Sequence, residues 1–113
     1  MKKFFRRINS YFGRIFARSG GLSDAVAQAL KEQNITDFEL KAVACDGIEE
    51  CRTALLKKSK NVLNGNFIEG MACKGGCIGG AGCLTHGEKN KAEVDKYGRE
   101  AYEKSISEAI SIL

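Results

Sequence analysis

The chain has 113 residues, of which 28% are charged and 43% hydrophobic, and these proportions are typical of one small globular domain. No apolar run approaches the length that crosses a bilayer, so we expect no membrane span. The sequence has five cysteines, which is an odd number, and no signal peptide is visible in it. We therefore expect a reducing compartment, the cytoplasm by default, where thiols serve metals or catalysis more often than disulfides.

The net charge of +4 arises at the N-terminus, where six basic residues and no acidic residue fall within positions 1–22. Residues 1–21 also carry apolar side chains at helical spacing, namely Phe4, Phe5, Ile8, Phe12, Ile15 and Phe16. An organelle presequence, a membrane-surface helix and an RNA-binding arm are open alternatives. We expect a basic amphipathic helix over 1–21 that packs on the rest of the protein, and no nucleic-acid partner.

Four elements are predicted over residues 22–72. The stretch "LSDAVAQALKEQN" favours a helix capped by Ser23, and "DFELKAVACDG" alternates as a strand that ends at an Asp-Gly turn. The stretch "IEECRTALLKKSK" favours a helix with Ile48, Cys51, Ala54 and Leu55 on one inward face, and "GNFIEGMA" reads as a second strand. Strand, helix and strand in this order predict parallel strands joined by a right-handed crossover.

A long closing helix is predicted over 90–113, with Tyr102, Ile106, Ala109, Ile110 and Leu113 turned inward. The predicted fold class is therefore α/β, a small strand-helix-strand-helix unit with parallel strands.

A cysteine- and glycine-rich loop follows the second predicted strand, in the stretch "EGMACKGGCIGGAGC" over 69–83. The carboxyl end of a strand is where open α/β sheets commonly place ligands. Gly75 and Gly76 disfavour a helix between Cys73 and Cys77, so we expect a coiled loop. Thiolates bind soft metals, and glycines let backbone N–H groups approach cluster sulfurs or other anions.

Other ligands compete for the same loop. A dinucleotide fingerprint fails because Thr85 occupies the place of its last glycine, and no P-loop is present. Cys73, Cys77, Cys83 and His86 supply four possible zinc ligands, although their spacing differs from the usual zinc modules. We expect Cys45 and Cys51 to be small buried hydrophobes and His86 to be a loop residue. The roles of these residues and of Cys83 stay open.

The stretch "FIEGMACKGGCIGGAG" resembles the last signature of the iron-only (FeFe) hydrogenases, Glu-x-Met-Ala-Cys-x-x-Gly-Cys-x-Gly-Gly. The matching residues are Glu69, Met71, Ala72, Cys73, Gly76, Cys77, Gly79 and Gly80. Residues 37–70 and the stretch "FARSGGLSDAVAQAL" are also similar to parts of that family. The resemblance implies that residues 22–113 form a C-terminal lobe of the hydrogenase catalytic domain, with a cluster-binding loop at 69–87.

The resemblance further implies a 4Fe-4S cubane held by four cysteines and joined through one cysteine sulfur to a two-iron subsite, where protons are reduced or hydrogen is cleaved. Cys73 would be a metal ligand of the cubane, and Cys77 the catalytic metal ligand that links the cubane to the two-iron subsite. Met71 would pack beside that subsite and Gly76 would belong to the cofactor-binding loop. Glu69 receives no role. An electron carrier such as ferredoxin is the implied redox partner.

Two further signatures of the family, a Thr-Ser-Cys-Cys-Pro block and a Met-Pro-Cys-x-x-Lys block, are missing, and the chain has no proline. We therefore expect the C-terminal piece of a hydrogenase, as a fragment, a truncated gene product or a split subunit. It would need the remaining N-terminal part of the enzyme or a partner subunit. The alternative is a freestanding small metal-binding module, for iron-sulfur or zinc, without hydrogenase activity.

Overall fold

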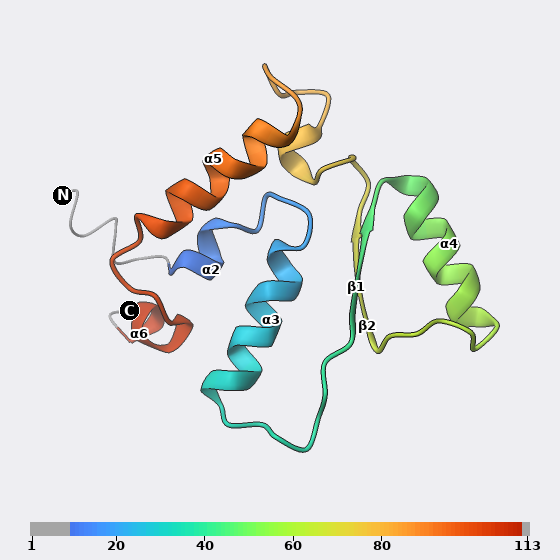
Figure 1. The fold of residues 1–113 in the computed structure, drawn as a ribbon, viewed down its shortest axis with the longest axis horizontal. Helices are drawn as coiled ribbons and strands as arrows, with labels where there is room; N and C mark the ends of the chain where they lie inside the picture. Colours follow the sequence, from blue (N-terminus) through green and yellow to red (C-terminus); the bar gives the residue numbers. More distant parts are fainter. Residues whose placement is uncertain (1–9, 112–113) are drawn as a thin grey trace.

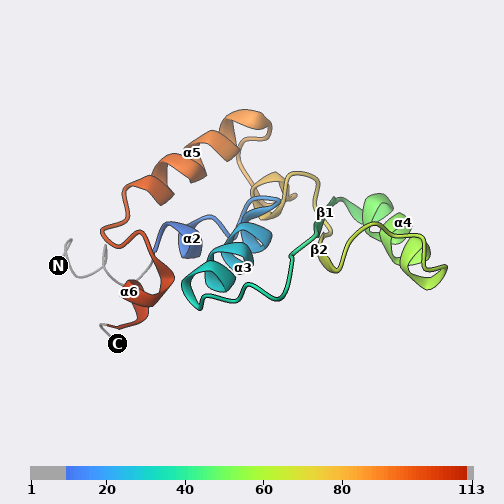
Figure 2. The same ribbon diagram turned by 60° about the horizontal axis from the view of Figure 1, so that its bottom comes forward.

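The computed structural model describes residues 10–111, and these residues form a flat molecule with extents of 49 × 42 × 19 Å. Its central element is a parallel pair of strands, β1 (Ala42–Asp46) and β2 (Phe67–Met71), placed between helices α3 (Gly21–Glu32) and α4 (Ile48–Ser59) (Figure 1). The remaining helices gather at the other end of the molecule from α4 (Figure 2). No helix within this described part is long and apolar enough to span a membrane.

The strand pair confirms the predicted α/β unit. Ala44 pairs with Glu69 and Cys45 with Gly70, and α4 forms the crossover between the two strands. Two neighbouring parallel strands require such a crossover because a tight hairpin turn cannot join them. Both strands therefore end at the same edge of the sheet, where the polypeptide continues from Met71 into the cysteine loop.

Helix α4 has acidic residues in its first turn and basic residues in its last turn, an arrangement that suits the helix dipole. The prediction of a shared inward face on this helix is only partly right. Ala54 is buried and Cys51 is half-buried, but Ile48 is 67% exposed and Leu55 is 61% exposed. The described chain thus supplies no layer that covers this part of α4.

The N-terminal segment contains helix α2 (Tyr11–Arg14), which begins where the Ser10 side chain accepts a hydrogen bond from the Gly13 N–H (3.2 Å). The predicted continuous helix over 1–21 is wrong in its described part, because the polypeptide turns after Arg14 and brings the Arg18 N–H to the Ile15 carbonyl (3.2 Å). Residues 1–9 of that prediction lie outside the described residues. Helix α2 packs on the rest of the protein as predicted, in contact with α3, α5 and α6.

Helix α3 confirms the predicted helix but begins earlier than predicted. Its N-cap is Gly20, at φ +87°, and Ser23 lies inside the first turn. Gly20 provides no side chain to satisfy the free N–H groups of this turn, so these groups need partners from elsewhere in the fold.

The predicted closing helix over 90–113 is two helices, α5 (Glu88–Arg99) and α6 (Ile106–Ile110). The Ser105 side chain accepts a hydrogen bond from the Glu108 N–H (3.1 Å), and Glu32 of α3 accepts from the N–H groups of Ile106 (2.9 Å) and Ser107 (2.7 Å). These hydrogen bonds satisfy free N–H groups in the first turn of α6, which therefore begins as a separate helix.

The inward face predicted for the closing helix is also only partly right. Ala109 is buried and Ile106 is half-buried, whereas Tyr102 and Ile110 are exposed. Leu113 lies outside the described residues.

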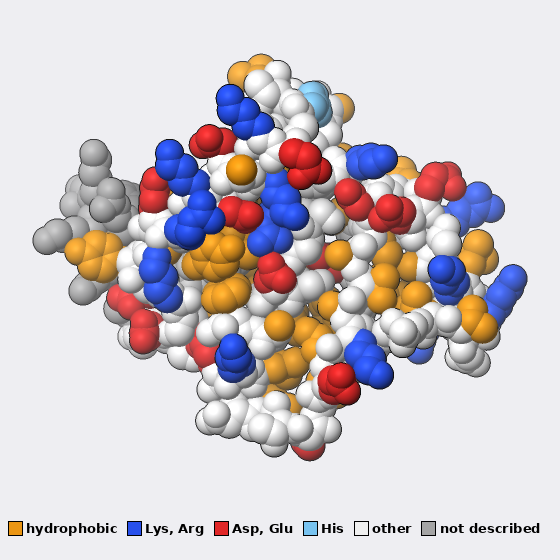
Figure 3. Space-filling view, viewed as in Figure 1, with side chains coloured by type: hydrophobic (Ala, Val, Ile, Leu, Met, Phe, Trp, Pro, Cys, Tyr) orange, Lys and Arg blue, Asp and Glu red, His pale blue; other side chains and the backbone are white. Residues whose placement is uncertain are grey.

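The core of the described residues is small. Its buried hydrophobic residues are Ile15, Ala25, Cys45, Ala54, Ala101 and Ala109, and of these only Ile15 is large. Many large apolar side chains remain exposed, and Figure 3 shows hydrophobic side chains gathered between α3 and the sheet and along α4. Apolar surface of this extent is typical of a protein that packs against further polypeptide.

Candidate functional site

The candidate site is the loop that leaves β2 at Met71 and carries Cys73 and Cys77. The Gly76 N–H donates to the Cys73 carbonyl (3.0 Å), and a short 3₁₀ helix, η1 (Cys77–Gly79), follows. The Gly80 N–H then donates to the Cys77 carbonyl (3.1 Å). The predicted coil between the two cysteines is therefore confirmed, and successive turns hold it in shape.

Two glycines of this loop have no room for a side chain. Gly76 has φ +90°, and a Cβ there would lie 2.6 Å from the Ser19 backbone N and 2.7 Å from the Ala17 carbonyl O. A Cβ on Gly79 would lie 1.9 Å from the Lys74 carbonyl O. The glycines thus permit close contact of the loop with itself and with residues 17–19.

Residues 17–19 form the backing segment of the loop. Arg18 and Gly76 form an antiparallel bridge, the Ser19 N–H donates to the Gly75 carbonyl (3.2 Å), and the Ile78 N–H donates to the Ala17 carbonyl (3.2 Å). These hydrogen bonds lie on both sides of Cys77 in sequence. The backing segment therefore restrains the part of the loop that carries this cysteine.

The Arg18 side chain anchors the backing segment. It is 7% exposed and its guanidinium donates to Asp95 of α5 (2.7 Å) and Asp24 of α3 (3.0 Å). Burial alone would lower the pKa of Arg18, but the hydrogen bonds to the two carboxylates outweigh it and raise the pKa. A buried arginine paired in this way fixes the position of its own backbone between two helices.

The four sequence-predicted site residues lie in this one loop. Cys73 and Cys77 are free and exposed, Met71 is half-buried, and Gly76 is buried against the backing segment. Asp46 at the end of β1 accepts a hydrogen bond from the Gly75 N–H, so the ends of both strands contribute to the loop. The backing segment and Asp46 hold the loop in place, while its two thiols stay accessible.

The zinc alternative is not supported. Among residues 10–111, no three His, Cys, Asp or Glu side chains gather in a group that could hold a metal ion, so Cys73, Cys77, Cys83 and His86 do not form a tetrahedral set. The Cys83 thiol donates to the Cys77 carbonyl (3.2 Å), and His86 Nε2 lies 2.9 Å from the Gly80 carbonyl O. Both side chains stabilise the turn after Cys77.

The two cysteines outside the loop differ in burial. Cys45 is 3% exposed, and burial, with a smaller effect of Cys51 and Glu50, raises the pKa of its thiol. It is the small buried hydrophobe that the sequence predicts. Cys51 is only half-buried, with Sγ 3.5 Å from the Met71 carbonyl O.

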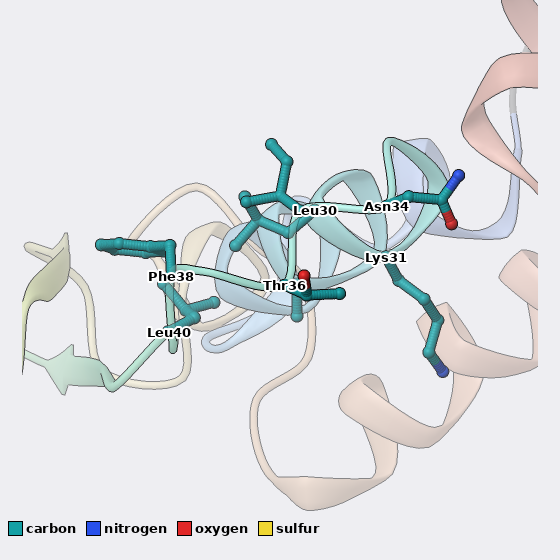
Figure 4. Close-up of a pocket in the computed structure, with 8 residues that line it drawn as sticks. Leu30, Lys31, Asn34, Thr36, Phe38 and Leu40 are labelled. Carbon is teal, nitrogen blue, oxygen red and sulfur yellow. The ribbon is translucent and has the colours of Figure 1, made fainter.

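The cavity beside the loop and the groove beside α3 do not include Cys73 or Cys77 in their lining. A cavity of about 940 Å³ with several charged lining residues, among them Lys74, Asp46 and Asp95, lies beside the loop. An apolar groove of about 420 Å³ lies between α3 and residues 34–40, where Leu30, Phe38 and Leu40 line it (Figure 4).

Three residues at or next to the loop had no role in the sequence-based prediction: Arg18, Asp46 and Glu69. Glu69 is the most informative, because a carboxylate inside an apolar strand is the usual signal of a buried and partnered charge. Arg18 gave no such signal, since it belongs to a run of similar basic residues.

The fold and the loop define an α/β protein that presents two free thiols on a glycine-rich loop at the carboxyl end of a parallel strand. The family model described as "Iron only hydrogenase large subunit, C-terminal domain" matches residues 2–81. The chain therefore belongs to the iron-only hydrogenase family, and the matched region belongs to the C-terminal domain of the large subunit. A search of curated proteins gives no match.

Proposed function

We propose that Cys73 and Cys77 are two of the four cysteine ligands of the active-site cluster of an iron-only hydrogenase. The observation that carries this proposal is the pair of exposed thiols on a glycine-rich loop that the family match covers and that the backing segment holds in place. Soft thiolate donors and close-packed glycine backbone suit an iron-sulfur cluster. When bound, the cluster supplies the reversible reduction of protons to hydrogen.

This chain contributes ligation and positioning to that chemistry. Cys73 would ligate the cubane, Cys77 would link it to the two-iron subsite, and Met71 would pack beside that subsite. The backing segment and the turn closed by Cys83 hold Cys77 in place. Burial of the loop by further polypeptide would exclude water from the site.

The missing ligands must come from the rest of the enzyme, as a covalent continuation or a separate subunit. The small core and the exposed apolar side chains of the described residues support this requirement. We place the enzyme in the reducing cytoplasm, which suits the five free thiols, with a ferredoxin-type protein as its electron carrier.

Coexpression of this chain with a polypeptide that carries the two missing cysteine blocks tests the proposal. We expect Cys77→Ala to abolish hydrogen turnover and Cys73→Ala to reduce the iron content of the complex. Cys51→Ala and Cys83→Ser are matched controls, and we expect both to keep iron and activity. Full iron content in both loop variants, with loss of iron in Cys83→Ser, would contradict the assignment.

A further inference from the structure

Glu69 is a charged residue in β2 that is only 3% exposed. It pairs in the sheet with Ala44, and its side chain leaves the strand toward α3. A carboxylate buried this deeply destabilises a fold unless hydrogen-bond donors satisfy it. The hydrogen-bond donors to Glu69 therefore indicate the structural role of this buried carboxylate.

Both carboxylate oxygens of Glu69 are occupied by the first turn of α3. Oε1 accepts a hydrogen bond from the Leu22 N–H (2.9 Å), and Oε2 accepts one from the Ser23 hydroxyl (3.0 Å). The N-cap of this helix is Gly20, which has no side chain for the purpose. Glu69 thus caps α3 from a different element, and its charge suits the positive end of the helix dipole.

This cap joins the two pieces of polypeptide that hold the cysteine loop. Glu69 lies two residues before Met71, on the strand that leads into the loop. The first turn of α3 follows directly after the backing segment, where Ser19 contacts Gly75 and Ala17 contacts Ile78. The hydrogen bonds of Glu69 therefore fix the strand and the backing segment relative to each other.

We propose that Glu69 is a positioning residue, which sets the placement of Cys73 and Cys77 by anchoring the start of α3 to β2. It acts through the backing segment and touches neither thiol in any described hydrogen bond. This role deepens the proposed function and rests on it for its catalytic meaning, but its structural part is measurable in the chain alone.

Amide hydrogen exchange of the full chain, followed by NMR, tests this role at the N–H groups of Ser19 and Ile78. These groups do not contact Glu69 and report only on the join between the backing segment and the loop. Because loss of a helix cap has a moderate effect, we expect Glu69→Leu to accelerate their exchange about tenfold. Glu69→Gln keeps an acceptor for Leu22 and a donor for the Ser23 hydroxyl, so we expect it to restore protection to within about threefold.

Glu32 offers a matched control, because it caps α6 from α3 in the same manner. We expect Glu32→Leu to accelerate exchange at Ile106 and Ser107 and to leave Ser19 and Ile78 unchanged. Ser23→Ala removes one bond of Glu69 and keeps the carboxylate, so it gives a milder variant with an expected change of about threefold.

Unchanged exchange at Ser19 and Ile78 in both Glu69→Leu and Ser23→Ala would overturn the proposal, as would equal acceleration in Glu69→Gln and Glu69→Leu. In the coexpressed complex, iron content and the visible spectrum of the bound cluster should persist in Glu69→Gln and decline in Glu69→Leu. If the wild-type complex binds no iron, the hydrogenase assignment fails, while the exchange data still decide the positioning role.

Discussion

Replacement of Ile15 by alanine tests the packing that holds the helical side of the molecule. Ile15 is the only large side chain that is fully buried in residues 10–111. Its Cγ2 lies against Gly98 of α5, where an added Cβ would be 2.9 Å away. The Ile15 side chain therefore packs directly against the backbone of α5, and this close contact is possible because residue 98 is a glycine.

The magnitude of the loss follows from the groups removed. Ile15→Ala deletes three buried carbon groups, which at about 0.8 kcal/mol each amounts to about 2.4 kcal/mol of transfer free energy. A cavity term adds to this, since the backbone around Gly98 cannot collapse fully, and we expect about 3 kcal/mol in total. For a domain of this size that corresponds to a lower melting temperature by about 10–20 °C.

Thermal and urea unfolding followed by circular dichroism measure this loss, with Ile48→Ala as the control for the same substitution at a 67% exposed site. We expect the control to lower the free energy of unfolding by less than about 1 kcal/mol. Equal effects of the two substitutions would refute the reasoning, because the fold would then not depend on the interface that Ile15 fills.

Two further predictions concern cluster assembly and pH. The purified chain alone should evolve no hydrogen and hold no complete cluster, because two thiolates cannot replace four. A hydrogen electrode and assays of iron and sulfide content check this. Robust hydrogen evolution by the purified chain would contradict it. The second concerns Glu32, where slight burial alone would raise the pKa, but hydrogen bonds from Ser107, Ile106 and Gln28 outweigh it and lower the pKa from 4.5 to about 2. Ionised Glu32 therefore stabilises the fold fully above pH 4.5 and loses this effect as the pH falls toward 2. Glu32→Gln should flatten that part of the acid-unfolding curve, and an unaltered curve would contradict the assignment.

Local patterns in the sequence determined the strand-helix-strand unit and the site loop. Alternation in 37–47 and helical spacing in 48–60 are short-range signals that predicted α4 and β1, although β1 spans only Ala42–Asp46. The stretch 65–72 likewise predicted β2. The parallel pairing followed from the order of elements alone. Gly75 and Gly76 likewise indicated a coil between Cys73 and Cys77, since glycine disfavours helix regardless of its surroundings.

Long-range contacts decided the remaining features. The start of α6 is capped by Glu32, which is more than seventy residues away from Ile106 and Ser107 in the chain, so helical periodicity in 90–113 does not indicate this partner. The local cap by the Ser105 side chain is the short-range signal of the break. The start of α3 at Gly21 depends in the same way on Glu69 of β2. Free N–H groups at a helix start can be satisfied by any nearby acceptor, so the sequence around the helix does not reveal which residue supplies it.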